Sequence, residues 1–485
     1  MPELQTKRSG WQQTCALAGG VVVWLLVQTW QGLFTGFSPD DIMNMYWAWT
    51  EPLGRLIVAN FFPFASNSYR PLGAVIYRVS FAIFGLRPFP LRILIYILLL
   101  VNAWLVFRLA RRLTGSREIA ALAAFLMSYH HELGDVYTNT GTIFDVVGCT
   151  FYALTLLYYA NVRARGRVVG WHYVVLYLLV AATLNSKEIG ASLPVVLLAY
   201  DWIYFKPLAK WRTLARWAAL DLAPIWMAAA VTALSIARKI SQGSHFAGNP
   251  DYRLRLSVAQ YFDTTGKYLG ELMWQRQPLP PAAVIAVFGA LITIAVIARR
   301  KHIWFCVAFV LIGPLPVNFI VSRSLFAIYV VLMPWSILAA ALLVETRDWL
   351  YARIWKRPVL PPDTWEPERV FLFLAVALML WNVGGNDAPI DWNVARPSNS
   401  LVHASIRGLR NMRLKPSSED KILLLDDRFT KDDWIPVLLL RMNYRNPQLS
   451  IDRAKWMNHT PQLGDYDFVV DWAKDRVVQT KNHRS

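Results

Sequence analysis

The chain has 485 residues, of which 55% are hydrophobic and 14% aromatic, and it carries a formal net charge of +18. Apolar runs close to the length that crosses a bilayer recur along it, and some, such as residues 281–298, are apolar on all sides. This pattern excludes a soluble protein. The Lys and Arg residues stand in short bursts between the runs, which is typical of cytoplasmic loops and not of a nucleic-acid-binding surface.

The apolar runs lie near residues 15–34, 71–85, 89–107, 118–133, 141–160, 171–184, 189–205, 216–237, 279–298, 303–321, 325–344 and 369–384. Two runs separate each basic burst from the next, so all bursts are cytoplasmic if each pair of runs is a hairpin. The run at 71–85 is short, begins with Pro71 and contains Arg78, which predicts an outer interfacial helix. We therefore expect about eleven transmembrane helices, the first of them retained rather than cleaved as a signal peptide.

Cysteine and histidine patterns do not indicate a metal site. Cys15, Cys149 and Cys306 lie within apolar runs at unrelated spacings. The adjacent residues His130–Glu132 lack the three- or four-residue spacing that would place two ligands on one helix face. We expect no cofactor, and a divalent metal is the less favoured alternative to a metal-free site.

The topology places the unusual polar clusters on the outer face. They are Asp40 and Asp41 after the first run, the turns at 129–141 and 184–190, the loop at 238–278, and Arg323. The loop at 238–278 is basic although it is predicted to lie outside, which suits an anionic substrate. The candidate chemistry thus gathers on one surface.

The composition changes after the last run. Residues 387–485 are polar, with a probable strand in "KILLLDDRF", helical periodicity in "DDWIPVLLLRMNY" and another strand in "DYDFVVDW". We predict a membrane domain at 1–386, a linker at 387–400 and a small extracytoplasmic α/β domain at 401–485. The acids of "LLLDDRFTKDDW" are interpreted as capping the following helix rather than as a second acidic site.

Each candidate residue also has a structural interpretation. Asp40 and Asp41 could cap a helix, line a cation pathway, or include a general base whose pKa is tuned by its neighbour. Arg323 could hold a phosphate or extend from a helix end toward water. Lys187 and Glu188 could form a simple salt-bridged turn.

The order of the motifs resembles a known family. After the first run and "DD" come "YRPL" (69–72) leading into "FGL", the histidine-containing turn, "SKE" (186–188), the segment "NPDYRLRLSVAQYFDTTGKYLGELMW" and "PLPVN" followed by an arginine. Over about residues 15–345 the chain resembles the C-type (GT-C) integral-membrane glycosyltransferases. It is closest to the O-mannosyltransferase-like group, which in animals carries tetratricopeptide repeats that this chain lacks.

The resemblance implies inverting transfer of a sugar from a polyprenyl-phosphate donor to an acceptor hydroxyl of a protein, glycan or lipid. The catalytic acids would be Asp40 and Asp41, one of them the general base, and we favour Asp40. The donor phosphate or sugar would meet Arg323, Lys187, Glu188, Tyr69, Arg70, His130 and Asp135. His131 replaces the proline that usually follows this histidine in the family. The enzyme would lie in the cytoplasmic membrane, with its site and C-terminal domain on the extracytoplasmic side.

Two other functions share parts of this pattern. A transporter or flippase of lipid-linked saccharides would bind the same ligand without reacting, and charged groups near the middle of the bilayer would favour it. A polymerase or ligase of envelope polysaccharide shares the donor chemistry but does not predict an acidic pair in the first outer loop.

The predicted topology can be tested with single cysteines and an impermeant maleimide in intact cells. We expect no labelling near Arg111, Arg165, Lys210, Arg300 or Arg353, and labelling at Ser244 and in the C-terminal domain. Permeabilised cells are the control and should be labelled at all positions. Labelling at position 165 from outside would contradict the arrangement.

Overall fold

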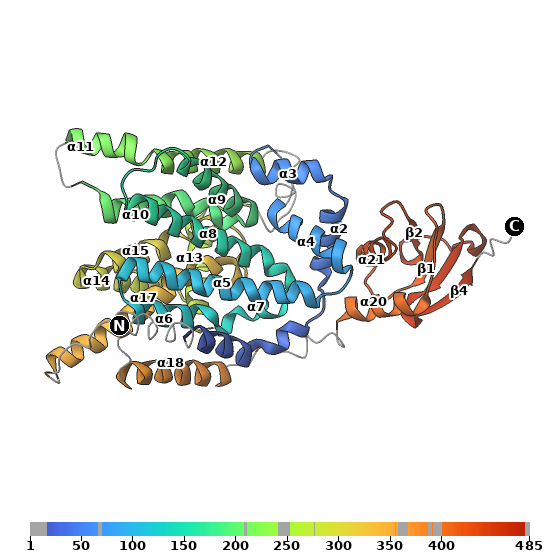
Figure 1. Ribbon diagram of the computed structural model, residues 1–485. Helices are drawn as coiled ribbons and strands as arrows, with labels where there is room; N and C mark the ends of the chain where they lie inside the picture. The colour runs from blue at the N-terminus through green and yellow to red at the C-terminus, as the bar shows by residue number, and fades with distance from the viewer. Residues whose placement is uncertain are drawn as a thin grey trace, which may run out of the picture.

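The computed structural model describes residues 17–65, 70–207, 211–240, 253–275, 277–354, 356, 367–386, 390 and 400–480. Its helices form a bundle, with a separate domain of strands and helices at one end (Figure 1). Tyr69, Cys15 and the predicted linker, apart from residues 390 and 400, lie outside the described residues.

Apolar helices of spanning length confirm a mainly helical, polytopic membrane protein. Within the described residues 7 helices are long and apolar enough to cross a membrane. They cover Leu17–Phe34 (ending in η1, Trp30–Phe34), Phe89–Thr114 (α5), Thr140–Arg163 (η3, Thr140–Thr142, and α8, Ile143–Arg163), Glu188–Phe205 (η4, Glu188–Ser192, and α10, Leu193–Phe205), Pro281–Ala298 (α14), Lys301–Asn318 (α15, Lys301–Ile312, and α16, Leu315–Asn318) and Leu325–Arg353 (η7, Leu325–Ile328, and α17, Tyr329–Arg353). A pair bent by 52° can form one more span and comprises α11 (Trp211–Arg216), η5 (Trp217–Asp221) and α12 (Ala223–Ile240).

The other predicted spans are shorter helices: α6 (Arg117–Ser128), α9 (His172–Ser186) and the apolar part Arg369–Asn382 of α18 (Pro367–Asn386). Helix α6 is buried from Glu118 to Ser128 and packs against α5 and α17, so it lies inside the bundle. Because these helices are shorter than a bilayer crossing needs, the count of about eleven crossings stays a prediction.

Short helices gather at one end of the bundle. They include α2 (Pro39–Thr50), α3 (Leu53–Phe61) and α4 (Pro71–Phe84). Further short helices are η2 (His131–Leu133), α7 (Gly134–Thr138) and α13 (Val258–Leu272). Figure 1 shows α2, α3 and α4 at this end, and α11 at the opposite end. Helix α11 contains Arg212 and Arg216, which belong to one of the basic bursts predicted to be cytoplasmic. With only 14 residues, α4 suits the interfacial helix predicted for the run at 71–85.

The C-terminal domain has the predicted α/β character. It contains α20 (Leu401–Met412), β1 (Lys421–Asp426), α21 (Ile435–Asn443), β2 (Ser450–Arg453), η8 (Ala454–Trp456), η9 (Leu463–Asp465), β3 (Phe468–Asp471), η10 (Trp472–Lys474) and β4 (Arg476–Thr480). The strand order is β2-β1-β3-β4, with β1 parallel to β2 and β3, and β4 antiparallel to β3. In register, Ile422 of β1 lies opposite Ile451 of β2 and Phe468 of β3.

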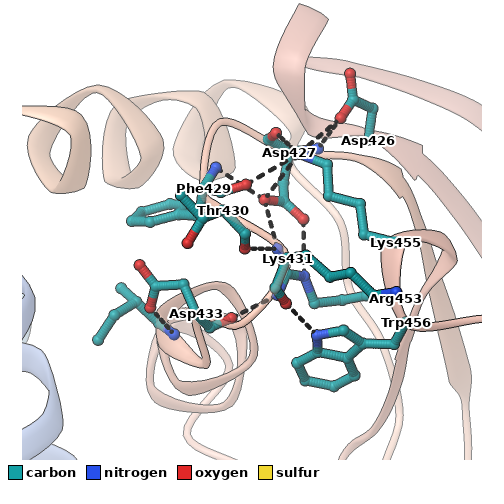
Figure 2. A network of polar contacts seen from close by, with 10 residues as sticks. Asp426, Asp427, Phe429, Thr430, Lys431, Asp433, Arg453, Lys455 and Trp456 are labelled. Atoms are coloured by element: carbon teal, nitrogen blue, oxygen red, sulfur yellow. Dashed lines mark hydrogen bonds and ion pairs between the residues drawn. The ribbon is translucent and has the colours of Figure 1, made fainter.

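A buried ion pair organises the loop after β1 (Figure 2). Arg453 Nε lies 2.9 Å from Asp427 Oδ2, and both side chains are almost completely buried. The same guanidinium donates to the backbone carbonyl of Thr430, and Asp433 Oδ1 accepts from the N–H of Ile435, the first residue of α21. The acids after β1 therefore shape the loop and the start of the helix, in keeping with their interpretation as structural groups.

The C-terminal domain packs on the outer short helices. Helix α21 contacts α2, and Arg441 donates a hydrogen bond to the Tyr46 hydroxyl of α2 at 3.3 Å. The Arg445 guanidinium lies 5.7 Å from the ring centre of Phe81 on α4 and donates to the carbonyl of Ala82. The domain and these helices thus share one side of the bundle, as the sequence predicts.

Helix α2 begins with a capping box. The Ser38 hydroxyl accepts from the Asp41 backbone N–H, and Asp41 Oδ2 accepts from the Ser38 backbone N–H at 2.8 Å. Asp41 Oδ1 also accepts from the Tyr77 hydroxyl at 2.7 Å, and the carboxylate has no exposed surface. Burial raises the pKa of Asp41 to about 6, although the hydrogen bonds from Ser38 and Tyr77 act in the opposite direction.

This pKa gives a signed prediction for stability. Because the pKa in the folded state lies above the model value of 3.8, the stability that Asp41 contributes is full below about pH 4 and is lost as the pH rises through about 6. Asp41→Asn is neutral throughout and can still cap the helix. We therefore expect the thermal midpoint of Asp41→Asn, minus that of the wild type, to increase between pH 4 and pH 7.5.

The measurement is a thermal-shift series on the detergent-solubilised protein. Asp40→Asn is the matched control, because it removes one charge from the neighbouring exposed position. A difference that shrinks over the same pH range would mean that Asp41 is stabilised as the carboxylate.

Candidate active site

A cavity of about 620 Å³ opens beside the short helices α2, α3 and α4. It is lined by Asp40, Met43, Asn44, Trp47, Ala48, Glu51, Leu56, Arg70, Ala74, Asn139, Gly141, Thr142, Phe144, Asp145, Lys187, Val321, Ser322, Arg323 and Phe326. Four residues predicted from the sequence, Asp40, Arg70, Lys187 and Arg323, therefore line the same space. They come from segments that are far apart in the chain.

Helical periodicity places Asp40 and Asp41 in different surroundings. Asp40 is exposed and lines the cavity together with Met43, Asn44 and Trp47, at the spacing that defines one face of a helix. The next residue is rotated by about 100°, so Asp41 points into the protein and forms the capping box. Asp40 is the carboxylate that faces the space where a substrate would lie.

The Arg70 guanidinium is held by Glu188. Its Nε and one terminal nitrogen each lie 2.9 Å from a different oxygen of that carboxylate, which makes the pair bidentate. Arg70 is 5% exposed and precedes α4 with a φ of 43°, an uncommon conformation for a residue with a side chain. The guanidinium also lies 5.0 Å from the ring centre of Phe144. Its position is thereby set from two sides.

Lys187 is held by Asp145. Its ammonium lies 2.8 Å from Asp145 Oδ1, and both side chains are at least 95% buried. Lys187 lies in the extended turn between α9 and η4, whereas Asp145 lies in the first turn of α8. The pair joins two spans at the cavity wall, and removing one partner of such a buried pair leaves a costly unpaired charge.

Arg323 enters the cavity from the second half of the chain. It lies in the irregular segment between α16 and η7, and its backbone N–H donates to the Tyr268 hydroxyl at 3.3 Å. Phe326, three residues after Arg323, also lines the cavity, and its ring centre lies 5.5 Å from the Lys187 ammonium. The cavity thus brings cations from both halves of the chain together with Asp40.

His130 and Asp135 do not line this cavity. The His130 ring is buried and stacks on Trp274 at 5.0 Å, and its Nδ1 accepts from the backbone N–H of Glu132. An imidazole that accepts at one nitrogen is neutral, so His130 does not offer a cation to a phosphate. Asp135 lies in the first turn of α7. Glu188 acts on the cavity through Arg70, and Tyr69 lies outside the described residues.

Several polar residues of the cavity were not predicted from the sequence: Asn44, Glu51, Asn139, Thr142, Asp145 and Ser322. The spacing from Asp40 could have identified Asn44 and Glu51, because positions four and eleven residues along a helix share a face. Asp145 offered a weaker signal as an acid inside an apolar run. Within the described residues no group of three or more His, Cys, Asp and Glu side chains is arranged to hold a metal ion. Whether the reaction needs a metal ion is not tested by this observation, and metal independence stays a prediction.

Comparison with known proteins agrees with the resemblance found in the sequence. The family model described as dolichyl-phosphate-mannose-protein mannosyltransferase matches residues 68–236, a segment that contains Arg70 and Lys187 but neither Asp40 nor Arg323. A search of curated protein sequences gave no match.

Several solved structures are similar. ArnT from Cupriavidus metallidurans in the apo state is 15% identical, with a TM-score of 0.51 over 92% of this chain and 87% of that one. The same protein bound to undecaprenyl phosphate gives 14% identity and a TM-score of 0.48 over 91% and 86%. An oligosaccharyltransferase from Archaeoglobus fulgidus, tethered with an acceptor peptide, is 13% identical. Its TM-score is 0.44 over 90% of this chain and 64% of that one.

Identities this low establish the fold and not the substrate. The likeness to apo ArnT extends over nearly the whole chain, and the family match falls on the segment that supplies two of the cavity's cations. The chain is therefore a multi-pass membrane protein with the GT-C fold of the integral-membrane glycosyltransferases.

Proposed function

We propose that this protein transfers a sugar from a polyprenyl-phosphate donor to an acceptor hydroxyl at the outer face of the cytoplasmic membrane. The observation that carries the proposal is the cavity itself, where the exposed carboxylate of Asp40 shares one space with Arg70, Lys187 and Arg323. A carboxylate and a set of cations are the groups that this reaction requires.

The reaction is a single displacement with inversion at the anomeric carbon. The acceptor oxygen forms a bond to that carbon while the bond from the carbon to the phosphate oxygen breaks. Asp40 takes the proton of the acceptor hydroxyl, and the polyprenyl phosphate leaves with the bonding electrons. The base and the phosphate must therefore act from opposite sides of the sugar.

The different surroundings of Asp40 and Asp41 support Asp40 as the base. Asp41 accepts hydrogen bonds from Ser38 and Tyr77 and is buried, so it has no free position for a substrate hydroxyl. Its hydrogen bonds hold the first turn of α2, which fixes the direction in which Asp40 faces the cavity. We therefore assign the base to Asp40 and a positioning role to Asp41.

The cations suit a phosphate leaving group. A sugar phosphodiester carries one negative charge and gains a second as the monoester departs, so donors aimed at the phosphate favour the transition state. Arg70 and Lys187 are held by Glu188 and Asp145 and need little rearrangement to act in this way. Arg323 supplies a guanidinium, whose planar donors can bind two phosphate oxygens together.

Apolar surface beside the cavity supports a lipid-linked donor. Met43 and Trp47 line the cavity and are 41% and 58% exposed. Leu56 of helix α3 lines the cavity, and the same helix exposes apolar side chains that include Leu53, Ile57 and Phe61. An amphipathic helix of this kind lies well at a membrane interface, where a polyprenyl chain could stay in lipid while its phosphate enters the cavity.

The partners follow from this chemistry. The donor is a polyprenyl-phosphate sugar, and the acceptor is a protein, glycan or lipid hydroxyl that reaches the cavity from the water side. We assign the cavity and the C-terminal domain to the extracytoplasmic side. The domain and the helices α2, α3 and α4, which supply part of the cavity lining, lie at the end of the bundle opposite α11 (Figure 1).

Asp40→Asn tests the base. The asparagine keeps the size of the side chain but cannot accept the proton, so we expect turnover to fall by about 10²- to 10⁴-fold. The assay is transfer of radiolabelled mannose from polyprenyl-phosphate mannose, with the glucose-linked donor in parallel, to acceptors in membranes that lack the protein. Asp41→Asn is the matched control. Its amide oxygen can still accept the hydrogen bond from the Ser38 N–H that holds the first turn of α2, so it should retain most of the turnover. Normal turnover in both variants would leave the reaction without its base.

Arg323→Ala tests the donor phosphate. Loss of a charge-assisted contact of about 1.5 to 3 kcal/mol should raise the donor KM by roughly one to two orders of magnitude. Arg323→Lys should lose much of the function as well, because an ammonium does not reproduce the bidentate geometry. Arg87→Ala, which removes an exposed arginine between α4 and α5 that does not line the cavity, is the control. A donor KM like that of the wild type in Arg323→Ala would remove this residue from the site.

A further inference from the structure

The segment that carries Arg323 has no regular structure of its own. Residues 319–324 connect α16 to η7 without helix or strand, and Ile320 is 7% exposed. The buried backbone groups of an irregular segment must pair with groups outside it. Helix α13 supplies the partners of the Ile320 carbonyl and of the Arg323 N–H. The N–H of Arg255, just before this helix, donates to the Phe319 carbonyl at 2.7 Å.

Side chains of α13 bind the segment at successive points. The amide of Gln260 donates to the Ile320 carbonyl at 2.9 Å, and the Thr264 hydroxyl donates to the same carbonyl. Further along, the Tyr268 hydroxyl accepts from the Arg323 backbone N–H at 3.3 Å. These side chains recur every four residues and therefore share one face of the helix.

The contacts continue on either side of Arg323. Asn318 at the end of α16 donates to the Thr265 hydroxyl at 3.0 Å, and Glu271 accepts from the backbone of Leu325 at the start of η7. One face of α13 thus follows the chain from α16 to η7. Tyr268 lies at the point of this ladder where Arg323 enters the cavity, and it is 2% exposed.

The opposite face of α13 carries two glycines, Gly266 and Gly270, against which the following chain packs closely. A Cβ at Gly266 would lie 2.2 Å from the Leu279 carbonyl oxygen, and one at Gly270 would lie 2.9 Å from that of Gln277. The chain leading to α14 therefore packs directly on the helix backbone, and the Leu279 N–H donates to the Gly266 carbonyl at 3.0 Å. Side chains at these two positions would push the chain away.

The C-terminal end of α13 is held by the turn that contains His130. The His130 Nε2 lies 3.4 Å from the Leu272 carbonyl oxygen, and its ring stacks on Trp274. Helix α13 is therefore fixed on its glycine face and at its end, while its polar face holds the segment of Arg323. A rigid element that binds an irregular one dictates where the irregular one lies.

We propose that α13 positions the phosphate-binding guanidinium of Arg323, and that Tyr268 is the positioning residue at that point. The inference rests on the proposed function, in which Arg323 binds the donor phosphate. Tyr268 acts on the backbone of Arg323 and does not itself line the cavity. Its loss should weaken phosphate binding only through Arg323.

A double-mutant cycle on the full-length, detergent-solubilised protein tests this, with undecaprenyl phosphate as the probe and tryptophan fluorescence as the signal. Tyr268→Phe removes only the hydroxyl, and loss of one hydrogen bond should raise the Kd by about 2- to 10-fold. Arg323→Ala should raise it by about one to two orders of magnitude. Because Tyr268 acts through Arg323, the double variant should bind like Arg323→Ala alone.

Three controls separate positioning from general damage. Tyr261→Phe lies on the same helix, and within the described part of the chain its hydroxyl makes no recorded hydrogen bond, so it should bind like the wild type. Undecaprenol, which lacks the phosphate, should bind all variants equally, and their thermal midpoints should agree. Gln260→Glu replaces a donor to Ile320 by an acceptor and should repeat the effect of Tyr268→Phe.

The outcomes are distinguishable. A wild-type Kd in Tyr268→Phe, or effects that multiply in the double variant, would overturn the positioning role while leaving the proposed function intact. A wild-type Kd in Arg323→Ala would instead remove the phosphate contact from the proposed function, and the positioning role with it.

Discussion

A guanidinium or ammonium group that is withdrawn from water beside a membrane needs an opposite charge, because an unpaired buried charge costs several kcal/mol. The cavity meets this condition with the pairs Arg70–Glu188 and Lys187–Asp145. Each pair joins segments that are distant in the chain. The pairs therefore hold the start of α4, the first turn of α8 and the turn before η4 together, and they keep two cations charged at the cavity wall.

The outer helices add what the ion pairs do not provide. The capping box of Ser38 and Asp41 fixes the first turn of α2, and the next side chain back, Asp40, consequently faces the cavity. On the other side of α2, the C-terminal domain contacts Tyr46 through Arg441. One short helix thus carries the proposed base on one face and contacts the C-terminal domain on another, which links the placement of that domain to the geometry of the site.

His130 illustrates the difference between a motif and a role. The resemblance implied that it meets the donor, yet its ring is buried, neutral and hydrogen-bonded to the end of α13. Helix α13 in turn holds the segment of Arg323 through Gln260 and Tyr268. His130 thus contacts α13, and α13 contacts the segment of Arg323. Through these contacts the histidine helps to hold Arg323, which lines the cavity, in position.

The sequence alone determined the class of protein, because apolar runs of bilayer length, separated by basic bursts, leave few alternatives to a polytopic membrane protein. It also indicated the small α/β domain, since β1 is a short apolar run and α21 has helical periodicity. It selected Asp40, Arg70, Lys187 and Arg323 because they stand in motifs whose order resembles that of a known family. Only the tertiary structure decided which of these residues meet. The burial of Asp41 depends on Tyr77, the charge on Lys187 is balanced by Asp145, and the segment of Arg323 depends on α13. These contacts join residues 36, 42 and 55 positions apart in the chain, and local periodicity carries no information about pairings at such separations.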